Sequence, residues 1–124
     1  MSYLYKPVAY LVADDFDTNG KLTNPEIPKD KPVLVMVQSN WCHFCTLSKP
    51  EFQQLAYEKP DVFCATIQAD GDQKGEKELG AKISKMIPNF KGFPTFVGYK
   101  NGELVDVYEG PREKDSLYQF ISSL

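Results

Sequence analysis

The chain has 124 residues, of which 42% are hydrophobic and 25% charged, and its formal net charge is −3. This composition predicts one soluble globular domain over residues 1–124, long enough to bury an apolar core. The weakly acidic balance, with no cluster of lysine and arginine, excludes an obvious nucleic-acid or membrane-surface partner. No apolar run is long enough for a membrane span.

The first half of the chain alternates short apolar runs with helical patterns. Val8–Val12 is a strand candidate, and a helical turn is expected at Asp14–Phe16. Val33–Gln38 is a continuous apolar run of strand length, typical of a buried parallel strand. A helix is expected from Cys42 to about Tyr57, with a kink at Pro50 because proline removes a backbone hydrogen bond. Its apolar positions are Phe44, Leu47, Phe52, Leu55 and Ala56.

Three further elements follow this helix in the sequence. Val62–Ala69 is predicted to be the next strand. Glu76–Met86 has the apolar spacing of an amphipathic helix, although Gly80 lowers the helix propensity there. Glu113–Leu124 is predicted to close the chain as a second amphipathic helix.

A β-hairpin is predicted between the last two helices. Asn101 and Gly102 separate the strand-like runs Pro94–Tyr99 and Leu104–Tyr108. Asn-Gly favours a tight hairpin turn because both central positions need a positive φ. The order of strands and helices predicts an α/β protein, with a mixed central β-sheet flanked by α-helices on both faces.

The most informative motif is Cys42-His43-Phe44-Cys45, directly after the apolar run that ends at Gln38. Unpaired backbone N–H groups and the helix dipole favour a negative charge at a helix start. Cys42 is therefore the candidate nucleophile, expected to be exposed and to have the lower pKa. Cys45, one turn later, is expected to resolve the mixed disulfide, so the pair predicts thiol–disulfide exchange.

The chain has one further cysteine and one histidine, which bear on whether the pair forms structural disulfides or binds a metal. Cys64 lies in an apolar run and is predicted to be a small buried strand residue. An odd cysteine count disfavours a framework of structural disulfides and favours a reducing compartment, the cytoplasm. A zinc site would need four ligands, and His43 is rotated away from Cys42 and Cys45. We expect neither a metal nor an organic cofactor; an inert cysteine pair is the remaining alternative.

The two residues between the cysteines are predicted to tune the reduction potential. A protonated His43 near Cys42 favours the thiolate and makes the pair more oxidising. Phe44 raises the local apolarity and works in the opposite direction. The alternative for His43 is a solvent-facing residue with no partner.

Several motifs, taken in order, resemble the thioredoxin superfamily. Trp41–Cys45 followed by Pro50 is similar to its active-site strand and kinked helix, and Gly92–Thr95 is similar to its cis-proline loop. Tyr108–Arg112 resembles the end of a protein-disulfide-isomerase catalytic domain. The resemblance runs from about Val33 to Leu124.

The resemblance implies a thioredoxin fold with a cis Phe93–Pro94 peptide bond packed against the cysteine pair. The exposed backbone of Phe93 would then pair with an extended substrate segment. Trp41, Gly92, Phe93 and Gly110 would form an apolar docking patch around the thiols. The alternatives are a trans proline at the start of an edge strand and a core role for Trp41.

The chain also departs from the family at informative positions. Typical members have a buried Asp or Glu under the second cysteine, where this chain has Met36. A carboxylate could accept the proton of Cys45, and a methionine cannot. Arg112 matches an isomerase arginine that can approach the active site and lower the pKa of the second cysteine. It can equally be a surface residue at the start of a helix.

Together these features predict a thiol–disulfide oxidoreductase that acts on protein disulfides or dithiols and is recycled by an unidentified redox partner. We expect a monomer, and the direction of electron flow stays open. One alternative is a thioredoxin-fold module that binds client proteins with poor turnover, which Met36 favours. Another is a dedicated disulfide-forming oxidase, favoured if His43 destabilises the disulfide.

Overall fold

The protein is organised around a mixed β-sheet in a computed structural model that describes residues 3–124. Its strands lie in the order β1-β3-β2-β4-β5. The first three of these pair in parallel, and β4 runs antiparallel to both β2 and β5. The strands are β1 (Ala9–Tyr10), β2 (Val33–Gln38), β3 (Phe63–Gln68), β4 (Thr95–Lys100) and β5 (Glu103–Tyr108).

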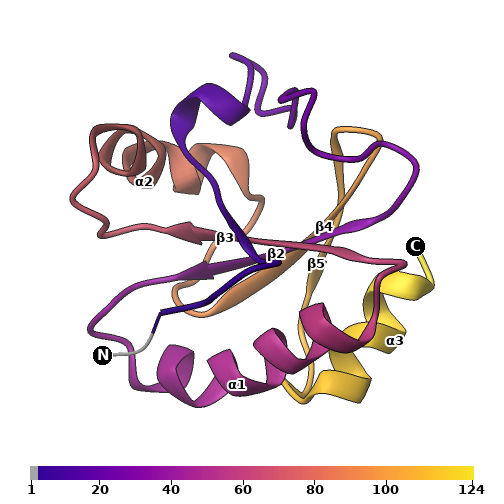
Figure 1. Cartoon of the computed structure of the whole chain (residues 1–124). Coiled ribbons are helices and arrows are strands. Elements are labelled where there is room, and N and C mark those ends of the chain that lie inside the picture. Colours follow the sequence, from indigo (N-terminus) through magenta and orange to yellow (C-terminus); the bar gives the residue numbers. More distant parts are fainter. Residues whose placement is uncertain (1–2) are drawn as a thin grey trace.

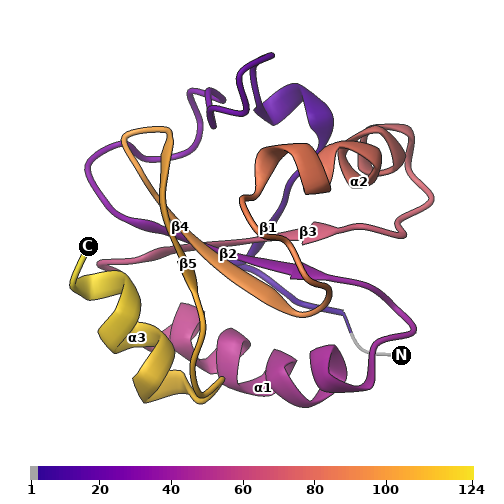
Figure 2. The ribbon, with the colours of Figure 1, turned by 180° about the vertical axis from the view of Figure 1, so that it is seen from behind.

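Helices cover both faces of the sheet (Figures 1 and 2). Helices α1 and α3 pack together on one face, and α2 lies on the other with the short 3-10 helix η1. This arrangement confirms the predicted α/β class with helices on both faces. The helices are α1 (His43–Glu58), α2 (Lys74–Met86), α3 (Lys114–Ser122) and η1 (Ala13–Asp15).

Strand β2 lies in the centre of the sheet and leads into the cysteine motif. All six of its residues are buried, as the apolar run predicts. Leu34 and Met36 belong to the core under α1 and α3, whereas Val33, Val35 and Val37 belong to the core under α2. Because both faces are packed, β2 gives the residues that follow it a rigid starting point.

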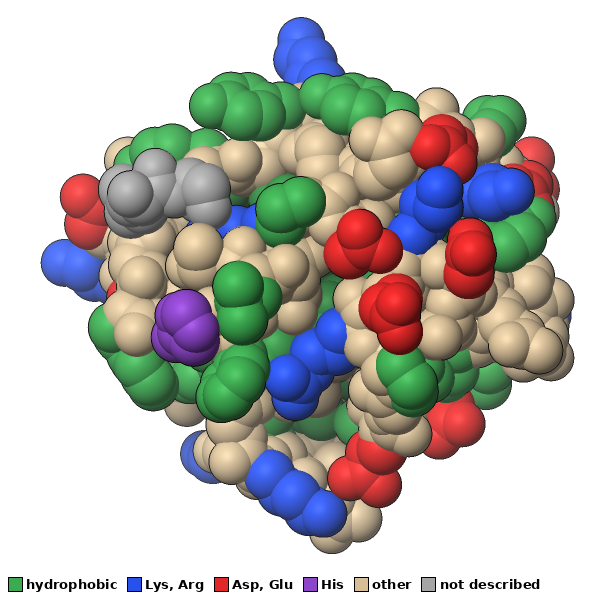
Figure 3. Space-filling model, turned by 90° about the horizontal axis from the view of Figure 1, so that it is seen from below, with side chains coloured by type: hydrophobic (Ala, Val, Ile, Leu, Met, Phe, Trp, Pro, Cys, Tyr) green, Lys and Arg blue, Asp and Glu red, His purple; other side chains and the backbone are tan. Residues whose placement is uncertain are grey.

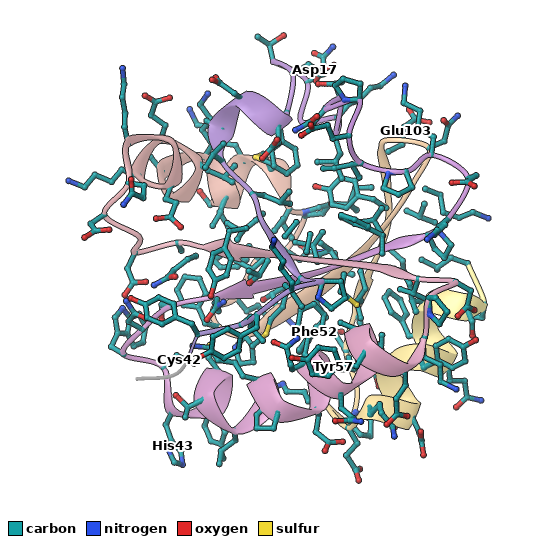
Figure 4. All side chains as sticks on the ribbon, in the orientation of Figure 1. Asp17, Cys42, His43, Phe52, Tyr57 and Glu103 are labelled. Atoms are coloured by element: carbon teal, nitrogen blue, oxygen red, sulfur yellow. The ribbon has the colours of Figure 1, made fainter. Side chains whose placement is uncertain are left out.

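The inner face of α1 differs from the predicted one. Its buried positions include Phe52, Leu55 and Ala56, as expected, but Phe44 and Leu47 are each 58% exposed. Burial at a helical spacing of three and four residues runs instead through Cys45, Ser48, Lys49 and Phe52. Two polar residues therefore occupy inner positions, and the first apolar pair faces solvent. Figure 4 shows Phe52 pointing between α1 and the sheet.

The remaining predicted elements appear with shifted ends. The first strand shortens to β1, and the hairpin turn has positive φ at Asn101 (51°) and Gly102 (83°), as Asn-Gly predicts. Helix α1 begins at His43, with Cys42 as its N-cap. Cys64 is buried in β3, as expected.

Gly80 lets α2 approach the end of β3. A Cβ at this position would clash with the backbone carbonyl oxygen of Ala69. Backbone atoms cannot move aside as a flexible side chain can, so the helix position depends on the missing side chain. The glycine that weakens the helix locally is thus required by packing.

We expect Gly80→Ala to destabilise the protein by roughly 1–3 kcal/mol, although alanine is the better helix former. Urea unfolding followed by circular dichroism measures the change. Lys82→Ala, at an exposed position of the same helix, is the control and should stay within about 0.5 kcal/mol. A gain in stability for Gly80→Ala would mean that α2 does not lie so close to β3.

Candidate active site

The segment between β2 and α1 is tied to the end of β3. The backbone N–H of Asn40 donates to both carboxylate oxygens of Asp70, at 3.0 and 2.9 Å. The N–H of Cys42 donates to the carbonyl of Ser39 at 3.4 Å. These contacts fix the backbone immediately before α1, so the position of Cys42 is set by two neighbouring strands.

Cys42 caps helix α1 with its own sulfur. It has extended backbone angles (φ −88°, ψ 112°), and its Sγ accepts the N–H of Cys45 at 3.1 Å. The contact turns the side chain inward, so only 6% of Cys42 is exposed. The prediction of an exposed Cys42 was therefore wrong. Cys42 is still the more accessible cysteine of the pair, and it lies where the helix dipole favours an anion.

Cys45 is fully buried one turn further along α1. Burial raises the pKa of its thiol to about 12, and the hydrogen bond and charge of Cys42 add to this effect. A backbone hydrogen bond from Ser39 and the charge of Lys49 act in the opposite direction on that pKa. Burial likewise raises the pKa of the Cys64 thiol to about 12. Both thiols are therefore protonated at neutral pH.

On the side of the sheet, the core beside the cysteines carries no charged residue at Met36 or its neighbours. Met36 is fully buried in the same cluster as Cys42 and Cys45. Thr66 donates its hydroxyl to the carbonyl of Met36 at 2.7 Å and accepts the Gln38 side-chain amide at 2.8 Å. The position where the resemblance implies a carboxylate is thus occupied by a thioether, with uncharged hydrogen bonds along the neighbouring strand.

An aromatic contact joins the cysteine segment to the loop before β4. Trp41 is 73% exposed, so it is not a core residue. Its ring meets Phe93 edge-on with 5.6 Å between centroids, and Phe93 in turn meets Phe90 at 5.4 Å. The Phe93–Pro94 peptide bond is cis. Trp41 and Phe93, far apart in the sequence, therefore lie side by side.

Five of the predicted substrate-contacting residues line one open cavity of about 340 Å³ beside this contact, whereas His43 and Phe44 do not. Segments before β4 and after β5 form its walls, so the hairpin brings them together. Among its lining residues are Gly92, Phe93, Pro94, Gly110 and Arg112.

Arg112, Phe44 and His43 form a row on the outer side of α1. The guanidinium carbon of Arg112 lies 5.9 Å from the centre of the exposed Phe44 ring. His43 is exposed, with 5.7 Å between its ring centroid and that of Phe44. It points away from the sheet in Figure 4, and Figure 3 shows apolar side chains beside the histidine on this face.

Comparisons with known proteins fit this geometry. A family model described as Thioredoxin matches residues 8–123. The chain belongs to the thioredoxin family. Chlamydomonas reinhardtii thioredoxin f2 superposes with a TM-score of 0.67 and 28% identity, covering 94% of each chain. The predicted thioredoxin fold is therefore confirmed.

Curated relatives include thioredoxin-like proteins and disulfide isomerases. Putative thioredoxin-like protein 453L of Invertebrate iridescent virus 6 is 43% identical over 117 residues, covering 84% of this chain and 83% of the viral protein. Protein disulfide-isomerase of Saccharomyces cerevisiae is 33% identical and covers 86% of this chain. The chain spans only 20% of that isomerase. These relatives and the cysteine pair support thiol–disulfide oxidoreductase activity in general.

Sequence reasoning missed three residues that the structure adds around the site. Phe90 extends the aromatic contact, Asp70 anchors the loop, and Lys49 lies on the inner face of α1. Only Lys49 had a sequence signal, its spacing of four residues from Cys45. Within residues 3–124, no group of three or more His, Cys, Asp and Glu could hold a metal ion. No helix in that range has the length and apolarity to cross a bilayer.

We expect iodoacetamide to modify Cys42 alone in the folded, reduced protein near pH 7.5. A pKa of about 12 leaves roughly one Cys45 or Cys64 thiol in 10⁴–10⁵ as thiolate at that pH. Labelling of Cys45 and Cys64 should rise as the pH approaches 12, and all three thiols should react in denaturant. Peptide mass spectrometry measures each site. Equal labelling of Cys42 and Cys45 at neutral pH would contradict the assigned environments.

Proposed function

We propose that this protein exchanges disulfides with protein substrates, with Cys42 as the nucleophile and Cys45 as the resolving thiol. The observation that carries the proposal is the capping contact. It holds the Cys42 sulfur at the N-terminus of α1 while Cys45 is fully buried behind it. A substrate sulfur can therefore meet Cys42 first.

The proposed reaction has two steps. The Cys42 thiolate attacks a substrate disulfide, forms a mixed disulfide, and releases one substrate sulfur as a thiolate that takes up a proton. Cys45 then loses its proton and attacks the Cys42 sulfur. The bond between Cys42 and the substrate breaks, and the second substrate sulfur leaves with the electron pair. The substrate gains two electrons, and the protein keeps a Cys42–Cys45 disulfide.

The surroundings of the pair support an extended polypeptide as substrate. Trp41 and Phe44 offer exposed apolar surface on either side of Cys42. The cavity lined by Gly92, Phe93 and Gly110 is open, and its small residues allow close approach of a partner backbone. Exposed apolar side chains and contacts to a substrate backbone do not depend on one substrate sequence, so they favour binding of many unfolded or flexible segments.

His43 and Arg112 are proposed to tune this site from outside. Both are exposed and each lies against the Phe44 ring. A protonated His43 next to Cys42 in the chain would favour the thiolate and a more oxidising pair. Arg112 lies between the cavity and Phe44, where a cation can contact an acidic group of an incoming substrate.

The chemistry needs no cofactor beyond the redox-active Cys42–Cys45 pair. A further redox partner must return that pair to the dithiol after each reduction. We propose that the protein works as a monomer in a reducing compartment such as the cytoplasm. Isomerase activity on misfolded substrates and electron transport to a reductase are further uses of the same pair.

A second candidate is a client-binding module that turns over poorly. Met36 favours it, because this buried thioether stands in the position of the family carboxylate and cannot accept the proton of Cys45. If resolution is slow, mixed disulfides persist and the protein holds its clients. The two candidates differ only in the rate of the second step.

Insulin reduction in the presence of dithiothreitol tests the main proposal. The wild-type protein should accelerate precipitation of the insulin B chain several-fold over dithiothreitol alone, and Cys42→Ser should remove the whole effect. Cys64→Ala is the matched control, because it removes a thiol that does not take part. A wild-type rate equal to that of dithiothreitol alone would favour the binding module.

Trapping assigns the roles of the two thiols. We expect Cys45→Ser to accumulate mixed disulfides with reducible substrates, because Cys42 can attack but no thiol releases the substrate. Cys42→Ser should accumulate none at neutral pH, since Cys45 is buried and protonated. Non-reducing gel electrophoresis after acid quenching measures the adducts. Similar yields from both variants would show that the roles are not divided in this way.

A further inference from the structure

The second step of the proposed reaction poses an electrostatic problem. Cys45 must become a thiolate in a fully buried position, although burial is the largest cause that raises the pKa of its thiol. A buried anion is costly unless an opposite charge lies nearby. Met36 cannot accept the proton or supply a charge, so another group must make the anion less unfavourable.

Lys49 is located where such a charge is needed. It follows Cys45 by four residues on the inner face of α1, so the two side chains lie on the same side of the helix, one turn apart. Only 4% of Lys49 is exposed. Within residues 3–124 it is the only buried lysine or arginine. A buried ammonium group next to a buried reactive thiol is not explained by packing alone.

The groups that act on Lys49 come from two elements. Cys45 and Cys42 belong to the start of α1, and Asp70 follows β3. Burial lowers the pKa of the Lys49 ammonium, whereas the charges of Cys45, Asp70 and Cys42 raise it, with Cys45 first among them. The interaction is reciprocal, because Lys49 lowers the pKa of Cys45. Asp70 is held in place by the backbone N–H of Asn40.

We propose that the Lys49 ammonium is the positioning residue that balances the negative charge of Cys45 when this thiol resolves the mixed disulfide. The inference rests on the proposed function and adds a residue to its second step. Cys45 gives its proton to solvent, and its sulfur forms a bond to the Cys42 sulfur. The substrate sulfur leaves with the electron pair and takes up a proton, so charge and protons balance.

The positive charge of Lys49 should speed resolution by Cys45 more than the initial attack by Cys42. Among the groups that raise the pKa of Lys49, Cys45 has a larger effect than Cys42. Removing the charge should therefore slow resolution by Cys45 more than the initial attack by Cys42. A purely structural role for Lys49 would not separate the two steps.

Reaction with the aromatic disulfide dithiobis(nitrobenzoate) measures the two steps in one experiment. Attack by Cys42 releases one coloured nitrothiobenzoate ion, and resolution by Cys45 releases the second. In stopped-flow absorbance at neutral pH, Lys49→Met should slow the second phase about tenfold, as a shift of about one pKa unit implies. The first phase should change by less than about threefold. Lys49→Arg should keep the second phase, because it keeps the charge.

Lys82→Met is the matched control, since it removes one lysine charge from α2 on the opposite face of the sheet. It should leave both phases unchanged. Circular dichroism and urea unfolding check that each variant is folded, and Lys49→Gln provides a second neutral side chain if Lys49→Met is not. An unchanged second phase in a folded neutral variant, or an equal loss in Lys49→Arg, would overturn the role of the charge.

An alkylation measurement separates this inference from the proposed function. In a Cys42→Ser background, the rate at which iodoacetamide labels Cys45 at about pH 8.5 follows its thiolate fraction without any turnover, and peptide mass spectrometry distinguishes Cys45 from Cys64. Lys49→Met should slow this labelling about tenfold, and Lys49→Arg should restore it. If the wild-type protein fails to reduce insulin but Lys49→Met slows the labelling, the function is wrong and the charge coupling stands. If insulin is reduced and neither the labelling rate nor the second phase changes, only the inference fails.

Discussion

The site depends on one hydrogen bond, from the backbone N–H of Cys45 to the Cys42 sulfur at 3.1 Å. It satisfies a helix-end donor that would otherwise lack a partner and fixes the sulfur at the positive end of α1. The same contact turns Cys42 inward, which explains its low exposure. The capping contact also links the two cysteines directly.

The order of the strands explains why the capping contact lies next to the surface that is proposed to bind substrate. Strand β2 lies between β3 and β4, so its end is next to the Asp70 segment on one side and the Phe93–Pro94 segment on the other. The Asn40–Asp70 hydrogen bonds fix the first neighbour, and the Trp41–Phe93 ring contact joins the second. Segments from three distant parts of the sequence thus meet next to the cysteine motif.

Local signals in the sequence were sufficient to predict the helices and strands. They were not sufficient to predict which way individual side chains point. The continuous apolar run predicted buried β2, Asn-Gly predicted the hairpin, and the position of Cys64 predicted its burial. The exposure of Cys42 was predicted wrongly, because capping by the sulfur depends on a rotamer that no spacing reveals. The inner face of α1 was misread because Ser48 and Lys49 are polar, and hydrophobic patterns assign such residues to solvent. The close approach at Gly80 required the position of Ala69.

A buried lysine cannot do in the second step what a buried carboxylate does. A carboxylate can take the thiol proton itself, so it acts as a base inside the core. A protonated lysine has no lone pair that could accept the thiol proton. It can only stabilise the thiolate after the proton has gone to water. Lys49 stops stabilising the thiolate once its ammonium loses a proton. Burial lowers the pKa of Lys49, so this loss occurs at a lower pH than for an exposed lysine. Asp70 opposes this shift and keeps the charge available. The charge of Lys49 therefore depends both on the Cys45 thiol, in the same helix, and on the Asp70 carboxylate, after β3. Met36 contributes no charge.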